Sequence, residues 1–75
     1  MNVEDFSDNT WIAVIDGTKT ANFENLGLKL LITNLRQRLR TKEFSMPLAV
    51  SDLKNFLVKY RTLPSLQADL DKIAR

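Results

Sequence analysis

Residues 11–23 of this chain read WIAVIDGTKTANF, and they determine which fold class we expect. The apolar run at the start of this segment is rich in residues that favour β-strands. It is followed by Asp16-Gly17, a strong hairpin signal, because both central residues of a type I′ turn need positive φ. We therefore predict a β-hairpin in which residues 18–23 form the returning strand.

The first strand of this hairpin would carry apolar side chains on both of its faces. In the predicted pairing, Ile12 and Val14 point to one side, whereas Trp11, Ala13 and Ile15 point to the other. An isolated two-stranded ribbon is only marginally stable in water, so the hairpin needs a cover on each side.

A long amphipathic helix is predicted from about Asn25 to Thr41. Its apolar side chains recur at the positions of one helical face, namely Leu28, Leu31, Ile32, Leu35 and Leu39. Leu26 and Leu30 fall on the opposite side, so Leu30 is either covered by the hairpin or left for a partner. Gly27 costs about 1 kcal/mol relative to Ala inside a helix, which allows the true start to lie after it.

Two further apolar stripes predict shorter C-terminal helices. The first comprises Leu53, Phe56, Leu57 and Tyr60, and the second comprises Leu66, Leu70 and Ile73. Residues 44–50 stay ambiguous, because Pro47 either stands in the first turn of a helix or restricts a short third strand at 48–50 to a sheet edge. The expected fold class is α+β, with an N-terminal β-hairpin packed on the long helix and two shorter C-terminal helices.

The chain is long enough for one small domain and no more. It has 75 residues with no cysteine and no histidine, which excludes disulfides, Cys/His zinc sites and catalysis by a Ser-His or Cys-His pair. We expect a polar flexible arm over residues 1–9 and a single α+β domain over residues 10–75. The N-terminus is acidic where a secretory signal is basic, and no apolar run approaches the length of a membrane helix. These features are typical of a cytoplasmic protein, such as a bacterial or phage accessory protein.

No motif for a cofactor, a metal or a catalytic group is present in the sequence. The segment 16–20 lacks the second glycine of a phosphate-binding loop, and no stretch has the ligand spacing of an EF-hand. Asp69 and Asp71 are two residues apart, so they point to different sides of a helix and do not form a catalytic pair. We therefore expect no cofactor, no metal and no enzymatic activity.

Charge is distributed unevenly along the chain, although the formal net charge is only +2. Residues 1–28 are predominantly acidic, whereas residues 29–61 are predominantly basic. Such asymmetry favours an anionic partner or head-to-tail association, and solvated helix faces produce it as well.

The leading interpretation is a non-enzymatic protein-binding module, acting as a regulator, inhibitor or adaptor. Its partner would be another protein of acidic character, or a second copy of the chain in a homodimer. Apolar residues would make the contact and two arginines would steer an acidic partner. The residues expected to bind the partner are Trp11, Ile15, Leu26, Leu30, Arg36 and Arg40.

The alternative function is nucleic-acid binding through a basic cluster on the long helix, because phosphate contacts dominate the affinity of such proteins. This cluster comprises Lys29, Arg36, Arg38, Arg40 and Lys42. Arg and Lys are favoured near a helix C-terminus in any case. A recognition helix at the end of the chain would also present Asp69 and Asp71 to the DNA. A membrane surface is not expected, since the core claims the apolar face of the long helix.

Overall fold

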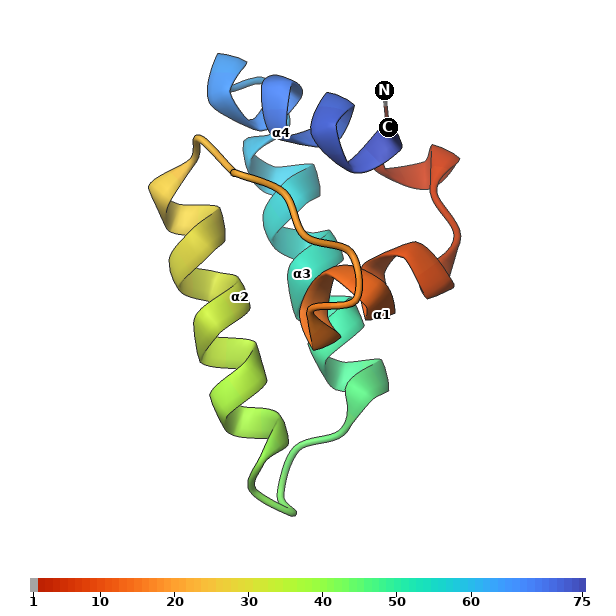
Figure 1. Ribbon diagram of the computed structural model, residues 1–75, viewed down its shortest axis with the longest axis vertical. Coiled ribbons are helices and arrows are strands. Elements are labelled where there is room, and N and C mark those ends of the chain that lie inside the picture. Colours follow the sequence, from red (N-terminus) through yellow and green to blue (C-terminus); the bar gives the residue numbers. More distant parts are fainter. Residues whose placement is uncertain (1) are drawn as a thin grey trace.

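The computed structural model describes residues 2–75. A short 3-10 helix, η1 (Val3–Asp5), precedes four α-helices in this range, which are α1 (Asp8–Asp16), α2 (Leu26–Leu39), α3 (Met46–Tyr60) and α4 (Pro64–Ala74). Helices α2 and α3 lie side by side in opposite directions, α1 packs against both, and α4 lies across one end of the pair (Figure 1). The described residues contain no strand, so the predicted α+β class is wrong and the chain is all-α.

The predicted hairpin is wrong because its first strand is part of helix α1. Trp11, Val14 and Ile15 have the i, i+3, i+4 spacing of one helical face, and all three are buried. A short apolar run satisfies the strand and the helix patterns equally well, so periodicity does not separate them. Gly17 has a φ of 89° and ends the helix as a left-handed C-cap instead of turning a hairpin. Residues 18–23 form an irregular connection to α2.

The segment before α1 also contributes to the core. Val3 in η1 is only 4% exposed, and η1 packs against α3. The Phe6 ring lies with its centre 5.0 Å from that of Trp11. The indole N–H of Trp11 has no hydrogen-bond partner among the described residues, and an unpaired buried donor costs about 1–3 kcal/mol. The stabilisation by Trp11 therefore comes from the apolar area that it buries.

The long helix and its core-facing stripe lie where the apolar spacing predicts them. Leu28, Ile32 and Leu35 of α2 are buried. The helix begins at Leu26, because the Asn25 side chain caps it by accepting a hydrogen bond of 2.9 Å from the Leu28 N–H.

Residues 46–60 form helix α3 rather than a third strand. Pro47 stands in the first turn of this helix, where a missing N–H costs nothing, so the strand alternative for residues 48–50 is wrong. The last apolar stripe lies in α4, where Leu66, Leu70 and Ile73 are all buried.

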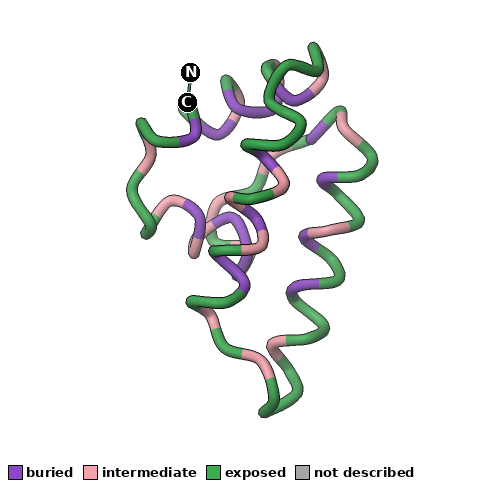
Figure 2. Tube along the Cα trace, turned by 180° about the vertical axis from the view of Figure 1, so that it is seen from behind, coloured by how far each residue is buried: buried purple, intermediate pink, exposed green. Residues whose placement is uncertain are grey.

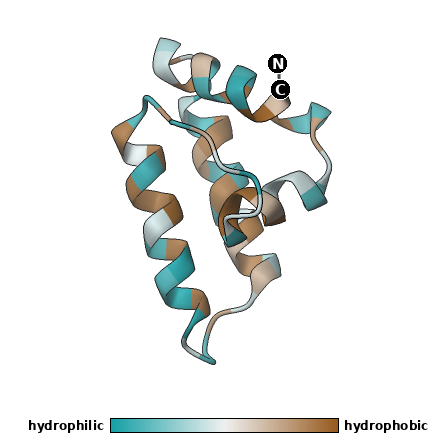
Figure 3. Ribbon diagram, in the orientation of Figure 1, coloured by the Kyte–Doolittle hydropathy of each residue, from teal (hydrophilic) through white to brown (hydrophobic). Residues whose placement is uncertain are grey.

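The apolar core lies where the helices converge, and buried positions face inward from each of them (Figure 2). Apolar residues are concentrated in the N-terminal half of α2, whereas its C-terminal half is mostly hydrophilic (Figure 3). Among residues 2–75, no helix has the length and apolar character needed to cross a bilayer.

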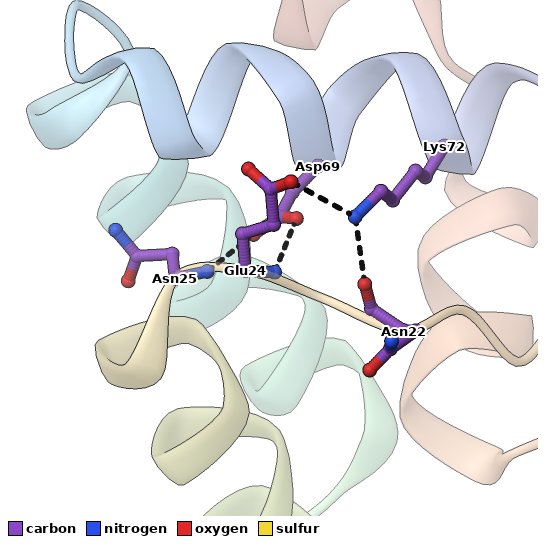
Figure 4. A network of polar contacts seen from close by, with 5 residues as sticks. All are labelled: Asn22, Glu24, Asn25, Asp69 and Lys72. Carbon is purple, nitrogen blue, oxygen red and sulfur yellow. Dashed lines mark hydrogen bonds and ion pairs between the residues drawn. The ribbon is translucent and has the colours of Figure 1, made fainter.

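A buried carboxylate ties α4 to the start of α2 (Figure 4). Asp69 is fully buried, and its two carboxylate oxygens accept hydrogen bonds of 2.7 Å from the Glu24 N–H and 2.9 Å from the Asn25 N–H. Lys72 donates to the Asn22 carbonyl at 2.8 Å and lies 3.5 Å from the Glu24 carboxylate. The expectation that Asp69 faces solvent on the last helix is therefore wrong, because this side chain holds two helices together.

Candidate functional site

Two exposed leucines stand on the solvent-facing side of α2. Leu26 and Leu30 are 68% and 63% exposed. They are four residues apart, so they are neighbours on one ridge of the helix. Fully burying such a side chain is worth about 1.5–3 kcal/mol, which makes this ridge a source of binding energy. Both residues are among those predicted to bind a partner, and both are accessible.

An open groove lies between α2 and α3 beside this ridge. It has a volume of about 590 Å³, and the residues that line it are Gly27, Leu30, Leu31, Thr33, Asn34, Gln37 and Phe56. We refer to it as the α2–α3 groove. None of these described lining residues carries a charge, so the groove favours an uncharged, largely apolar occupant.

Gly27 stands inside α2 because the Phe56 ring approaches it closely. A Cβ added to Gly27 would lie 3.3 Å from Cζ of Phe56 and 3.1 Å from the capping oxygen of Asn25. The Phe56 ring is also in contact with the Tyr60 ring, at a centre-to-centre distance of 4.9 Å. The absence of a side chain at position 27 thus gives Phe56 its place in the wall of the groove.

Trp11 and Ile15 lie in the core and not on this surface. Both are fully buried on α1, on the same helical face as Val14. Their place in the predicted docking surface depends on the hairpin, which the chain does not form. The accessible apolar residues of the predicted site are therefore Leu26 and Leu30, and the groove adds Leu31 to them.

Arg36 caps the C-terminal end of α1. Its Nε donates a hydrogen bond of 2.6 Å to the Ile15 carbonyl, and its Nη2 donates one of 3.0 Å to the Val14 carbonyl. Carbonyls in the last turn of a helix have no partner within it, and a cation there also complements the helix dipole. Gly17 completes the cap by donating its N–H to the Ala13 carbonyl at 3.1 Å. A substitution of Arg36 consequently tests the fold as well as binding.

The basic residues of the alternative nucleic-acid site are divided between the two flanks of α2. Lys29 and Arg36 lie on the flank that faces the connection from α1. Arg38 lies on the flank towards α3, where its guanidinium is 4.0 Å from the centre of the Phe44 ring and 3.7 Å from the Asp52 carboxylate. All five basic residues are exposed, and Arg40 and Lys42 follow Leu39, the last residue of the helix.

The acidic side chains of the described residues do not form a reactive cluster. No three of them gather closely enough to hold a metal ion. Hydrogen bonds from the side chain and the backbone of Thr18 lower the pKa of Asp16 below its ordinary value. Asp16 is exposed and is the last residue of α1, so the lowered pKa reflects the local turn that follows the helix.

Comparison with known proteins finds no matching protein family, no matching curated protein and no matching solved structure. No function is therefore carried over from a relative, and the surfaces of α2 are the basis for inferring one.

Proposed function

We propose that this protein is a non-enzymatic protein-binding module, and that Leu26 together with the α2–α3 groove is its docking surface. The observation that supports this most directly is the exposure of Leu26 and Leu30 on a helix that already buries a separate leucine stripe. A contiguous apolar patch on a small protein often marks an interaction site. Here the patch continues from the ridge into a groove, so it offers shape as well as apolar area.

The occupant that this surface favours is an amphipathic helix from another protein. Helices that bind in grooves present apolar anchors at i, i+3, i+4 and i+7, and a groove between two antiparallel helices accommodates such a stripe. The charge beside the groove favours acidic residues along the margin of the partner helix. Lys59 lies with its Nζ 5.3 Å from the Tyr60 ring, which in turn packs on Phe56 in the groove wall.

A second copy of the chain is a less favourable occupant. A symmetric dimer presents the same patch on both subunits. Pairing through the groove would bring two copies of Lys59 to one interface, and the described lining of the groove includes no acidic residue to offset them.

Selection from a displayed library of helical peptides tests this function, because the library offers many candidate partner helices at once. The library is selected on the wild-type chain alone, and the enriched peptides are then measured on Leu30→Asp. We expect enriched peptides to carry apolar residues at helical spacing with acidic flanking residues. Their affinity should fall at least about tenfold, or about 1.4 kcal/mol, for Leu30→Asp. Val58→Asp is the matched control, because Val58 is 43% exposed on α3 and lies outside the groove lining.

The outcomes of the selection separate the alternatives. Enriched peptides that bind wild type and the Val58 variant but not the Leu30 variant support the proposal. Equal binding to all three proteins, or the absence of any enriched helical pattern, contradicts it. Analytical ultracentrifugation of the wild-type chain identifies the remaining case, since a dimer that Leu30→Asp dissociates assigns the groove to a second copy.

A further inference from the structure

A second hollow, on the other flank of α2, is lined by cations. It has a volume of about 320 Å³ and lies between α2 and the connection from α1. Its polar lining comprises Lys19, Lys29 and Arg36 together with Thr20 and Thr33, and none of the described lining residues is acidic. We refer to it as the basic hollow. It shares Thr33 with the α2–α3 groove but none of that groove's apolar residues.

The Arg36 side chain at this hollow is held in place by its hydrogen bonds to the end of α1. Its two hydrogen bonds to the end of α1 use two of the five N–H donors of a guanidinium and leave three for a ligand. A side chain that is already ordered loses less conformational entropy when it binds. Arg36 therefore offers oriented donors, which a freely moving arginine does not.

The rest of the lining adds two lysines and apolar side chains. Lys19 is half-buried and Lys29 is exposed, and neither forms an ion pair with a carboxylate among the described residues. The lining also includes the buried apolar side chains of Phe23 and Ile32, and surroundings of low polarity strengthen the interaction of nearby charges. The Thr33 hydroxyl already donates to the Lys29 carbonyl at 3.0 Å, which leaves the Thr20 hydroxyl as the neutral donor.

We propose that the basic hollow binds a phosphoryl group. A phosphate monoester carries a charge of about −1.5 to −2 at neutral pH and three acceptor oxygens. Three cations from two segments of the chain offset that charge in full, and the guanidinium of Arg36 offers donors to its oxygens. The phosphate comes from a free phosphate or a phosphate monoester, or from the backbone of a nucleic acid, whose diester groups each carry one negative charge. A nucleic acid would extend to Arg40, which lies four residues beyond Arg36 on the same flank of α2.

Phosphate titration of the full chain, followed by two-dimensional NMR, tests the site. Inorganic phosphate is compared with sodium chloride at matched ionic strength. We expect saturable shifts confined to residues 19–23 and 29–36 with phosphate and not with chloride. The double substitution Lys19→Gln, Lys29→Gln should weaken binding at least about tenfold. Lys42→Gln with Arg75→Gln is the control, since it removes the same charge outside the hollow.

Oligonucleotides and Arg40→Gln distinguish the two sources of the phosphoryl group. Binding of single-stranded or duplex oligonucleotides that weakens steeply between about 50 and 200 mM salt, and that Arg40→Gln reduces, assigns the hollow to a nucleic acid. Phosphate binding that Arg40→Gln leaves intact, without oligonucleotide binding, assigns it to a free phosphate or monoester. Shifts that chloride reproduces, or that the Lys19, Lys29 variant retains, overturn the proposal.

Discussion

Arg36 on α2 donates a hydrogen bond of 2.6 Å from its Nε to the carbonyl oxygen of Ile15, in the last turn of α1. The same guanidinium also reaches the Val14 carbonyl, so one side chain satisfies two carbonyls that their own helix leaves free. This contact ties two helices together across an irregular connection. The charge pattern assigns Arg36 to partner binding, but these two hydrogen bonds make it part of the fold.

Removing the Arg36 cap should destabilise the protein. Arg36→Met keeps the aliphatic stem but leaves two carbonyls without their charged donor, which should cost about 1.5–3 kcal/mol in the free energy of unfolding. Arg40→Met is the control, because the Arg40 side chain forms no hydrogen bond or ion pair among the described residues, whereas Arg36 forms two hydrogen bonds. A surface change of this kind stays within about 0.5 kcal/mol. Urea denaturation at neutral pH measures both. Equal destabilisation by the two variants would show that the cap contributes nothing.

The buried carboxylate on α4 gives a second test of the fold. Asp69→Asn replaces an acceptor oxygen with a donor facing the backbone N–H groups of Glu24 or Asn25. We expect the free energy of unfolding to fall by about 1.5–3 kcal/mol. Asp71→Asn, an exposed change on the same helix, should stay within about 0.5 kcal/mol of wild type. Thermal unfolding of the two variants compares them directly, and a stable Asp69 variant would contradict the role assigned to this carboxylate.

The glycine that ends α1 should resist substitution. Gly17 has a φ of 89°, and an L-residue in the left-handed region costs about 1–2 kcal/mol. Gly17→Ala should therefore destabilise the chain by about that amount, and Gly17→Asn by less, because asparagine tolerates this conformation better. Denaturation curves of the two variants test the order. An alanine variant as stable as wild type would mean that the helix ends elsewhere.

Asp16 should make a pH-dependent contribution to stability. Its pKa in the folded protein is lowered from 3.8 by hydrogen bonds from Thr18, so the ionised form stabilises the fold. That contribution is present above about pH 3.8 and is lost as the pH falls through the lower pKa of the folded state. Wild type should therefore lose stability on acidification relative to Asp16→Asn, which keeps the acceptor but does not titrate. Urea midpoints measured between about pH 2 and 5 check this, and parallel curves would contradict it.

The helices that the sequence predicts are those whose apolar spacing extends over several turns. The spacing of Leu28, Ile32 and Leu35 fits a helix and not a strand, so α2 lies where this spacing predicts it. The apolar run in α1 is too short to distinguish the period of a helix from that of a strand. Asp16-Gly17 is compatible with both a hairpin turn and a helix C-cap, because both need a positive φ at the glycine. Ser7 at the N-cap and Asp8 in the first turn, about one helical turn before Trp11, are the local signal of a helix start that favours the correct alternative.

The sequence predicts only those residues of the candidate site whose exposure follows from their place on a single helix. Leu26 and Leu30 fall opposite the core stripe of α2 whatever packs beneath it, and both are exposed. The assignment of Trp11 and Ile15 to the docking surface depends on the incorrect hairpin. The cap by Arg36 and the wall formed by Phe56 beside Gly27 join segments far apart in the chain, and spacing along the sequence contains no signal for either contact.

Calorimetric titration of a selected acidic amphipathic peptide into wild type, Leu30→Asp and Val58→Asp tests the docking surface most directly. We expect wild type and the Val58 variant to bind alike, while the Leu30 variant stays folded and loses at least about tenfold in affinity. Burial of the groove should also give wild-type binding a negative change in heat capacity. A Leu30 variant that binds as tightly as wild type, or that unfolds because Leu30 belongs to the core, would contradict the assignment of this groove as an interface.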